Sequence, residues 1–186
     1  TSLLKNNVTY GALQLPDYNF ETKRQIADAM EKAKKNFIEV GQELSKMTGR
    51  KYCFFEDYLL KDAGYVIVIM NSSAGTAKLA VDKLRKKGKK VGLLKPVLFR
   101  PFPYDEIKNA LEGKTIAVLD RSESFGAAPP LCAEIKASLF GEKSGVQSYI
   151  YGIGGRELFE KDVEKIFEDL MGGKIDGKTR YVGVRE

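Results

Sequence analysis

The sequence contains no histidine, no tryptophan and only two cysteines. Without histidine, the chain lacks the side chain that most often serves as a general base or as a zinc ligand. Cys53 and Cys132 lie far apart and form no CxxC pair, so they are too few to hold a structural zinc ion or an iron–sulfur cluster. Two isolated cysteines also argue against a disulfide-stapled secreted protein and are typical of a reducing cytoplasm.

Long hydrophobic runs and targeting signals are missing as well. The longest apolar stretches, such as residues 65–70, are far too short to span a bilayer, and no basic segment followed by an apolar one marks a secretory signal. We therefore expect no membrane partner. The chain has 186 residues, the size of one domain with or without an appendage. It starts at Thr1 rather than Met, so we expect a trimmed chain or a piece of a longer polypeptide.

Positive charge is in modest excess, with 31 Lys and Arg against 25 Asp and Glu and a net charge of +6. Much of the excess lies in residues 83–90 (KLRKKGKK), which we interpret as the last turn of a helix, where cations complement the helix dipole. A solvated lysine-rich surface explains this charge more simply than an anionic partner does. Nucleic-acid binding would require a steep dependence on salt, and we expect no nucleic-acid partner.

Hydrophobic periodicity predicts a long helix followed by alternating strands and helices. Apolar residues recur every three or four positions from residue 20 to residue 47, and Gly49 suits the end of that helix. Residues 1–19 are predicted to be a connecting arm, and residues 172–186 a loose tail. Beyond the long helix, we predict strands at 52–58, 65–70, 90–99, 115–119 and 146–151, and helices at 74–87, 104–111, 130–140 and 161–170. Such alternation predicts a largely parallel sheet with helices on both faces.

Two loops that follow buried strands carry the candidate site. Residues 71–76 open a helix whose free N–H groups suit a phosphate or a carboxylate, although an ordinary N-cap explains this loop as well. Arg121 follows the next buried strand, where it either clamps an anion or pairs with Asp120, Glu123 or a partner domain. Neither loop matches the Walker A or GxGxxG pattern. The candidate anion crevice comprises Ser72, Ser73, Gly75, Thr76, Arg121, Ser122 and Ser124.

No catalytic set can be assembled from these loops. Ser73 and Ser124 have no base to activate them, and no metal cluster is visible, so we expect no catalytic, cofactor-binding or metal-binding residue. Residues 95–103 contain three prolines and are predicted to form a packed turn. The glycine-rich residues 151–157 predict a strand-to-helix loop that leaves Arg156 at the surface.

Taken together and in order, several segments resemble the α chain of the pyruvate:ferredoxin oxidoreductases. The similarity covers residues 8–170, nearly the whole chain. Two positions depart from the family pattern, because Asn71 stands where a glycine is expected and AAPP at residues 127–130 replaces a more glycine-rich stretch. The segments that carry the resemblance are residues 8–33 (VTYGALQLPDYNFETKRQIADAMEKA), 49–52 (GRKY), 72–95 (SSAGTAKLAVDKLRKKGKKVGLLK), 99–103 (FRPFP), 118–126 (VLDRSESFG) and 152–163 (GIGGRELFEKDV).

The resemblance implies an α/β fold similar to the transketolase C-terminal domain. That fold is a three-layer α/β/α arrangement whose five-stranded, mostly parallel sheet has the order 1-3-2-4-5 with strand 1 antiparallel. It implies an interdomain arm and long helix at residues 1–48, the α/β domain at 49–171 and the tail at 172–186. Strand order would then reverse between the loops at Asn71 and Asp120, so both candidate loops would line one crevice.

The resemblance also implies a function for the complete enzyme. A 2-oxoacid, pyruvate in the first place, is oxidatively decarboxylated with coenzyme A to acetyl-CoA and carbon dioxide while ferredoxin is reduced, a reaction of anaerobic metabolism. Thiamine diphosphate, iron–sulfur clusters and coenzyme A would bind elsewhere, so this chain would be inactive alone. It would brace the catalytic parts of a dimeric cytoplasmic enzyme by contacts with other domains or subunits. The alternative is an independent small-anion-binding module.

Overall fold

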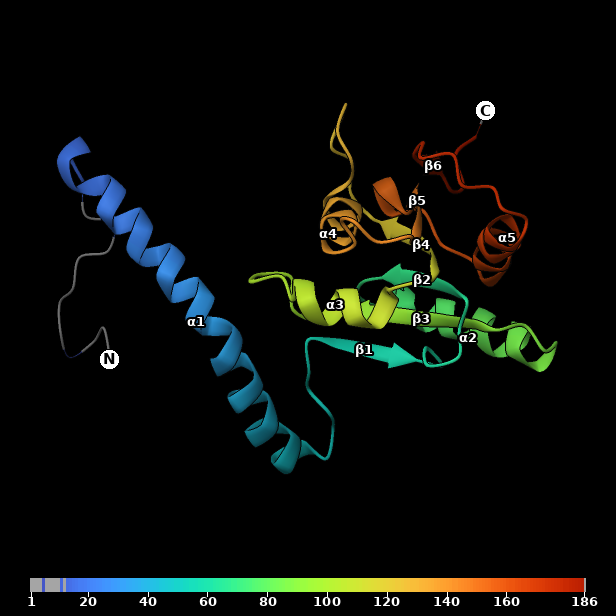
Figure 1. Cartoon of the computed structure of the whole chain (residues 1–186), viewed down its shortest axis with the longest axis horizontal. Coiled ribbons are helices and arrows are strands. Elements are labelled where there is room, and N and C mark those ends of the chain that lie inside the picture. The colour runs from blue at the N-terminus through green and yellow to red at the C-terminus, as the bar shows by residue number, and fades with distance from the viewer. Residues whose placement is uncertain (1–4, 6–10, 12, 186) are drawn as a thin grey trace.

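The computed structural model describes residues 5, 11 and 13–185, and Figure 1 shows a long helix that leads into a compact α/β unit. The elements are α1 (Pro16–Thr48), β1 (Phe55–Tyr58), β2 (Tyr65–Ile69), α2 (Ser73–Lys86), β3 (Val91–Pro96), α3 (Tyr104–Leu111), β4 (Thr115–Asp120), α4 (Pro130–Ser138), β5 (Gly145–Ile150), the 3₁₀ turn η1 (Ile153–Gly155), α5 (Glu160–Met171) and β6 (Arg180–Tyr181). The predicted alternation of strands and helices is therefore confirmed.

The six strands form one sheet in the order β1-β3-β2-β4-β5-β6. β1 runs antiparallel to β3, and the other neighbours are parallel, which confirms the expected order and the expected antiparallel strand. The expected count of five strands is wrong, because the tail adds β6 beside β5. A strand of two residues carries no alternation that a sequence could reveal; it is held by its pairing to β5 and by the Val182 N–H donating to the Ile150 carbonyl at 2.8 Å.

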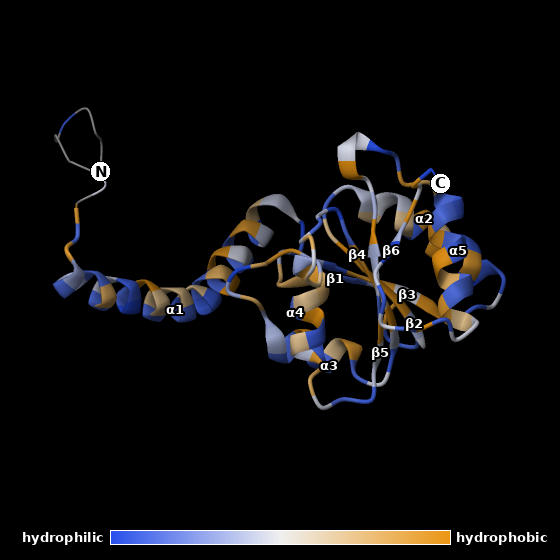
Figure 2. Ribbon diagram, turned by 90° about the horizontal axis from the view of Figure 1, so that it is seen from above, coloured by the Kyte–Doolittle hydropathy of each residue, from blue (hydrophilic) through white to orange (hydrophobic). Residues whose placement is uncertain are grey.

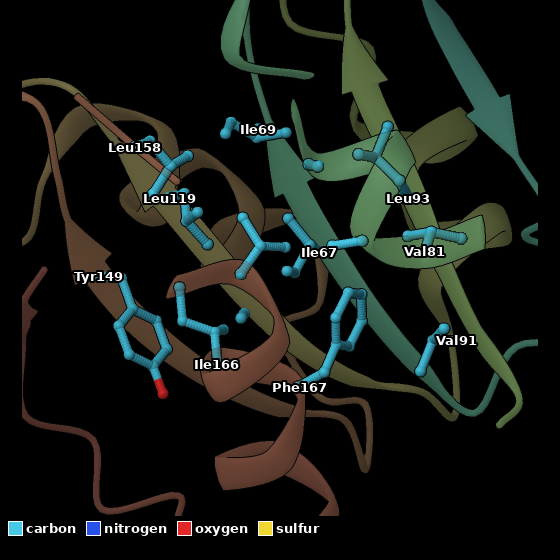
Figure 3. Close-up of a cluster of buried hydrophobic side chains, with 14 of the residues drawn as sticks. Ile67, Ile69, Val81, Val91, Leu93, Leu119, Tyr149, Leu158, Ile166 and Phe167 are labelled. Atoms are coloured by element: carbon cyan, nitrogen blue, oxygen red, sulfur yellow. The ribbon is translucent and has the colours of Figure 1, made fainter. Parts of the chain in front are cut away.

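Helices cover both faces of the sheet and create two apolar cores. α2 and α5 pack on one face, where Phe167 of α5 is fully buried among residues of β2, β3 and β4 (Figure 3). α2 presents Ala74, Ala77 and Ala80 to the sheet, and these small side chains let its backbone come close. α3 and α4 form the second core on the other face. Burial of the apolar faces of all four helices fixes where the strand ends lie.

α1 begins earlier than the sequence pattern predicts. Pro16 occupies the first turn, where its fixed φ and missing N–H cost nothing, so residues 16–19 of the expected arm are helical. The rest of that arm falls largely outside the described residues. The expected helix end is confirmed, because Gly49 adopts a left-handed φ of 70° and its N–H bonds the Ser45 carbonyl at 2.9 Å.

Only the C-terminal half of α1 packs on the α/β unit, while its first turns project away from it (Figures 1 and 2). Phe37 stacks on Phe54 with ring centroids 5.8 Å apart, and the Lys34 ammonium pairs with Glu106 of α3 at 2.8 Å. Among the described residues, no helix combines the length and the apolar character needed to cross a membrane.

Candidate functional site

The loops that follow β2, β4 and β5 meet at the carboxyl edge of the sheet and enclose a crevice. β2 and β4 are neighbours there, while the chain continues to β3 on one side and to β5 on the other, so strand order reverses at this point. A cavity of about 340 Å³ opens between the two loops. Its walls are Met70, Asn71, Ser72, Ser73, Phe99, Leu119, Asp120, Arg121, Ser122, Pro130, Leu131 and Tyr151.

A second, more polar cavity of about 310 Å³ adjoins the first. The two cavities share Ser72, Ser73, Arg121 and Tyr151, so they form one continuous crevice. The second part lies between the start of α2 and the loop after η1. Its walls are Ser72, Ser73, Thr76, Arg121, Tyr151, Gly155, Arg156, Glu157 and Leu158.

No side chain of the described residues caps the start of α2. Asn71 adopts a left-handed φ of 61°, a conformation that asparagine tolerates better than most residues, which explains why a glycine would also suit this position. Ser72 is the N-cap residue, but its side chain makes no capping hydrogen bond, so the N-cap interpretation is wrong for this side chain. The first turn of α2 contains no acidic residue. Hydroxyls and a positive helix end therefore line this wall of the crevice.

Arg121 lies against the backbone of the loop that follows β5. Its Nε donates to the Gly152 carbonyl at 3.1 Å. Gly152 has a φ of 67°, and a Cβ at this position would meet the Arg121 Nε at 3.2 Å, so only a glycine leaves room for this contact. Of the alternatives for Arg121, pairing with Asp120 or with Glu123 is wrong within the described part of the chain, because both carboxylates bind elsewhere.

Asp120 is 4% exposed and caps α4 from a distance. Its two carboxylate oxygens accept hydrogen bonds from the Leu131 N–H at 2.8 Å and from the Cys132 N–H at 3.0 Å. Burial raises the pKa of Asp120, and the two backbone hydrogen bonds oppose that rise. This carboxylate is therefore committed to α4 even though it contributes to the crevice wall.

Glu123 folds back on its own loop. Its Oε1 accepts from the Ser124 and Phe125 N–H groups at 2.9 and 3.0 Å, and its Oε2 accepts from the Tyr181 hydroxyl at 2.5 Å. The hydrogen bond from Tyr181 lowers the pKa of Glu123, and the same bond raises the pKa of Tyr181. The loop after β4 is thus tied to the C-terminal segment, on the side away from α2.

Five of the seven residues predicted for the anion crevice do line it. They are Ser72, Ser73, Thr76, Arg121 and Ser122. Gly75 and Ser124 do not appear in either wall. Tyr151 and Arg156 belong to the walls but were not among the predicted residues. Their position after β5 could have pointed to them, because parallel strands end at the same edge of the sheet and residues after β5 therefore lie near those after β4.

The described residues show no cluster of metal-binding side chains. No group of three or more Cys, Asp and Glu side chains is placed to hold a metal ion among them. Cys132 is fully buried, and burial raises the pKa of its thiol, which makes it a poor nucleophile. The donor set therefore does not fit an iron–sulfur cluster, and we assign no reaction step to these residues.

Two motifs have structural explanations. The packed turn predicted for residues 95–103 is confirmed: Phe102 is 5% exposed and meets Phe99 edge-on, with ring centroids 5.9 Å apart. The basic run at residues 83–90 ends α2, as predicted. There the Lys83 ammonium pairs with Glu164 of α5 at 2.6 Å.

Comparisons with known proteins point to one family. Residues 63–163 match the family model described as pyruvate:ferredoxin oxidoreductase core domain II. The pyruvate synthase subunit PorA of Thermotoga maritima is 45% identical over 183 residues, which cover 96% of this chain and 47% of the relative. The ketoisovalerate oxidoreductase subunit VorA of Pyrococcus horikoshii is 42% identical over 185 residues, covering 95% of this chain and 47% of the relative. The chain thus spans about half the length of these curated relatives.

A solved structure gives a further likeness. It is the 2-oxoglutarate:ferredoxin oxidoreductase from Magnetococcus marinus with 2-oxoglutarate, coenzyme A and succinyl-CoA bound. The match has a TM-score of 0.51 and 17% sequence identity, and it covers 68% of this chain and 21% of that chain. At this identity the likeness supports the fold alone.

Proposed function

Because the chain belongs to the pyruvate:ferredoxin oxidoreductase core domain II family, we propose that it is a non-catalytic structural part of a 2-oxoacid:ferredoxin oxidoreductase. The complete enzyme would convert pyruvate and coenzyme A to acetyl-CoA and carbon dioxide while reducing ferredoxin. Pyruvate is the first choice of substrate because the PorA relative is 45% identical, and 2-ketoisovalerate is the second because of VorA. Thiamine diphosphate, the clusters and coenzyme A would bind to other parts of that enzyme.

The observation that carries this proposal is the unpartnered apolar face of α1. Ile26, Met30, Val40 and Leu44 recur at helical spacing, and 52%, 41%, 61% and 38% of their surfaces are exposed. Val40 and Leu44 lie in the half of α1 that packs on the α/β unit and line a groove there, whereas Ile26 lies on the projecting part, which has no core of its own to cover it (Figure 2). A face of this kind stabilises a protein only when another surface buries it, so we assign it to contacts with other domains or subunits.

The same proposal covers assembly and location. We assign the complete enzyme a dimeric state, ferredoxin as its electron acceptor and a cytoplasmic location. Cys53 and Cys132 are both free thiols, which is consistent with a reducing compartment.

Co-purification from the source cells tests the proposal. The chain is tagged and recovered gently, and the eluate is assayed for thiamine, iron and partner polypeptides. We expect thiamine-binding and cluster-bearing polypeptides, or one longer chain that contains them. The eluate should reduce ferredoxin with pyruvate and coenzyme A, with 2-ketoisovalerate and 2-oxoglutarate as comparison substrates. A lone 20.7 kDa species without thiamine or iron would contradict the proposal.

A matched pair of variants places the contact on α1. Ile26→Lys puts a charge on the apolar face, whereas Gln42→Lys puts the same charge on an exposed polar position of the same helix. We expect Ile26→Lys to reduce partner recovery at least about tenfold and Gln42→Lys to leave it unchanged, since burying an unpaired charge costs several kcal/mol. Circular dichroism confirms that both variants remain helical. Equal recovery of the two variants would remove α1 from the interface.

A further inference from the structure

We propose that the crevice between α2 and the loops after β4 and β5 is a binding site for a small molecule that carries a phosphate group, held between Arg121 and Arg156. This site goes beyond the structural role proposed above and does not depend on it. Its parts come from three separate segments that the sheet brings to one edge (Figure 1).

The two guanidinium groups line the same cavity of about 310 Å³ from different loops. Arg121 uses its Nε for the Gly152 carbonyl, and Arg156 uses one terminal nitrogen for the Gly183 carbonyl. Within the described part of the chain, the remaining nitrogens of both groups have no hydrogen-bond or ion-pair partner. Each arginine is therefore held by one bond to backbone and keeps free donors, the arrangement that suits forked binding of phosphate oxygens.

The buried Tyr151 side chain adds a polar group to the wall of the crevice. It is 5% exposed and lines both parts of the crevice. Its hydroxyl lies within hydrogen-bonding reach of the Ser73 side chain. Burial raises the pKa of Tyr151, so the hydroxyl keeps its proton and can donate it.

The start of α2 completes the site. Ser72 and Ser73 precede or occupy its first turn, Thr76 lies one turn on, and all three line the second cavity. Their hydroxyls add donors to the cavity that Arg121 and Arg156 also line, whereas the Ala74 and Gly75 N–H groups bond the Asn71 and Ser72 carbonyls at 3.3 and 2.9 Å. Phosphate accepts more hydrogen bonds than a carboxylate does and carries more negative charge, so it matches this number of donors better.

Charge and size narrow the class of ligand. Glu157 also lines the second cavity, but two arginines outweigh it, and Asp120 is engaged by α4. The volume of about 310 Å³ lies at the lower end of small-molecule pockets. The part lined by both arginines therefore fits inorganic phosphate or the phosphate group of a monoester, and the adjoining cavity of about 340 Å³ leaves room for an organic part.

Titration of the full chain tests the proposal. The ligands are inorganic phosphate and glycerol 3-phosphate, with acetate as the carboxylate comparison, all at constant ionic strength. Binding is followed by calorimetry and by the backbone amide NMR shifts of residues 71–76. Arg121→Ala and Arg156→Ala each remove one clamp, and Tyr151→Phe removes only the buried hydroxyl. Arg50→Ala is the matched control, because it removes an exposed arginine after α1, away from the crevice.

We expect saturable phosphate binding that shifts these amides and that acetate does not reproduce. Arg121→Ala and Arg156→Ala should each weaken it about tenfold to a hundredfold, and Arg50→Ala should leave it unchanged. Tyr151→Phe should weaken binding at least about threefold without lowering the melting temperature.

Equal binding of both phosphate ligands would show that the phosphate group alone is recognised, and preference for the monoester would show that the organic part is recognised as well. Equal affinities in Arg121→Ala and Arg50→Ala, binding of acetate as tight as phosphate, or no saturable shift would overturn the proposal. Because the chain is tested by itself, none of these outcomes depends on its partners in the complete enzyme.

Discussion

Replacing Asp120 tests how the edge of the sheet holds α4 in place. α4 starts at Pro130, and its N-cap residue is Pro129, which has no side chain able to cap a helix. Asp120 performs this task from β4 by accepting the Leu131 and Cys132 N–H groups. Those two residues are 3% and 0% exposed, so no solvent is at hand to replace the carboxylate.

The expected loss follows from this geometry. Hydrogen bonds to a charged acceptor contribute about 1.5–3 kcal/mol each, and removing the acceptor leaves two buried donors unpaired. Relief from burying the carboxylate offsets part of this loss. We expect Asp120→Ala to lower the free energy of unfolding by about 2–4 kcal/mol, and Asp120→Asn, which keeps one acceptor oxygen, by about 1–2 kcal/mol.

Urea unfolding followed by circular dichroism measures both losses. Asp57→Ala is the control, since this exposed aspartate on β1 should change stability by less than about 0.5 kcal/mol. A loss below about 0.5 kcal/mol for Asp120→Ala would refute the assignment of the cap.

The dependence on pH gives an independent check on Asp120. Burial raises its folded pKa above the ordinary value of 3.8, so the folded state binds the proton more tightly than the unfolded state does. The wild type therefore gains stability from this group as the pH falls through the folded pKa towards 3.8. Asp120→Asn has no proton to gain at this position, so the difference between its unfolding free energy and that of the wild type should widen as the pH falls over that range. If this difference in unfolding free energy narrows instead, the two backbone hydrogen bonds lower the pKa of Asp120 by more than burial raises it.

Two further predictions concern other parts of the sheet and its helices. Gly92→Ala should lower the free energy of unfolding by about 1–3 kcal/mol in urea, because the added Cβ would lie 2.7 Å from the Leu59 carbonyl oxygen. The control Gly75→Ala in α2 adds a Cβ that meets nothing within 4 Å, so it should be neutral or stabilise by up to about 1 kcal/mol. Equal effects of the two substitutions would contradict the close approach at β3. The hydrogen bond from Lys78 lowers the pKa of Glu56 below its ordinary value of 4.5, so the carboxylate stabilises the fold above that pH, and this stabilisation is lost as the pH falls through the folded pKa. The unfolding free energies of wild type and Glu56→Gln should therefore converge at low pH. A difference in unfolding free energy that persists at low pH would contradict the pairing.

Most of the α/β unit could be predicted from the sequence because its elements have strong local signals. The apolar, β-branched runs at 65–70 and 115–119 are typical of strands buried on both faces, and the helix at residues 104–111 has the bounds that the sequence predicts. β6 and the first turn of α1 escaped for physical reasons. A strand of two residues depends on its partner, and Pro16 suits a helix start as well as an arm.

The candidate site shows a different limit of sequence reasoning. Serines and an arginine after buried strands gave a local signal, and five predicted residues do line one crevice. The sequence could not decide whether Arg121 pairs with Asp120 or stays free. The answer depends on α4, which has no capping side chain of its own, so its first N–H groups bond the Asp120 carboxylate. Tyr151 stands at the end of the strand predicted at residues 146–151, and this position was the only local signal for it. Only the pairing of β5 with β4 brings it to the crevice.

The two proposed surfaces share one segment of the chain. Phe99 lines the first part of the crevice, while Leu98, Arg100 and Pro101 line a groove of about 460 Å³ against α1. The groove also includes Val40 and Leu44, which belong to the face assigned to docking. Because prolines fix this loop and Phe102 anchors it in the core, it links the two sites as a rigid spacer rather than a hinge. The loop therefore keeps the crevice and the groove at a fixed spacing, and the separate variants Ile26→Lys and Arg121→Ala can tell the two surfaces apart.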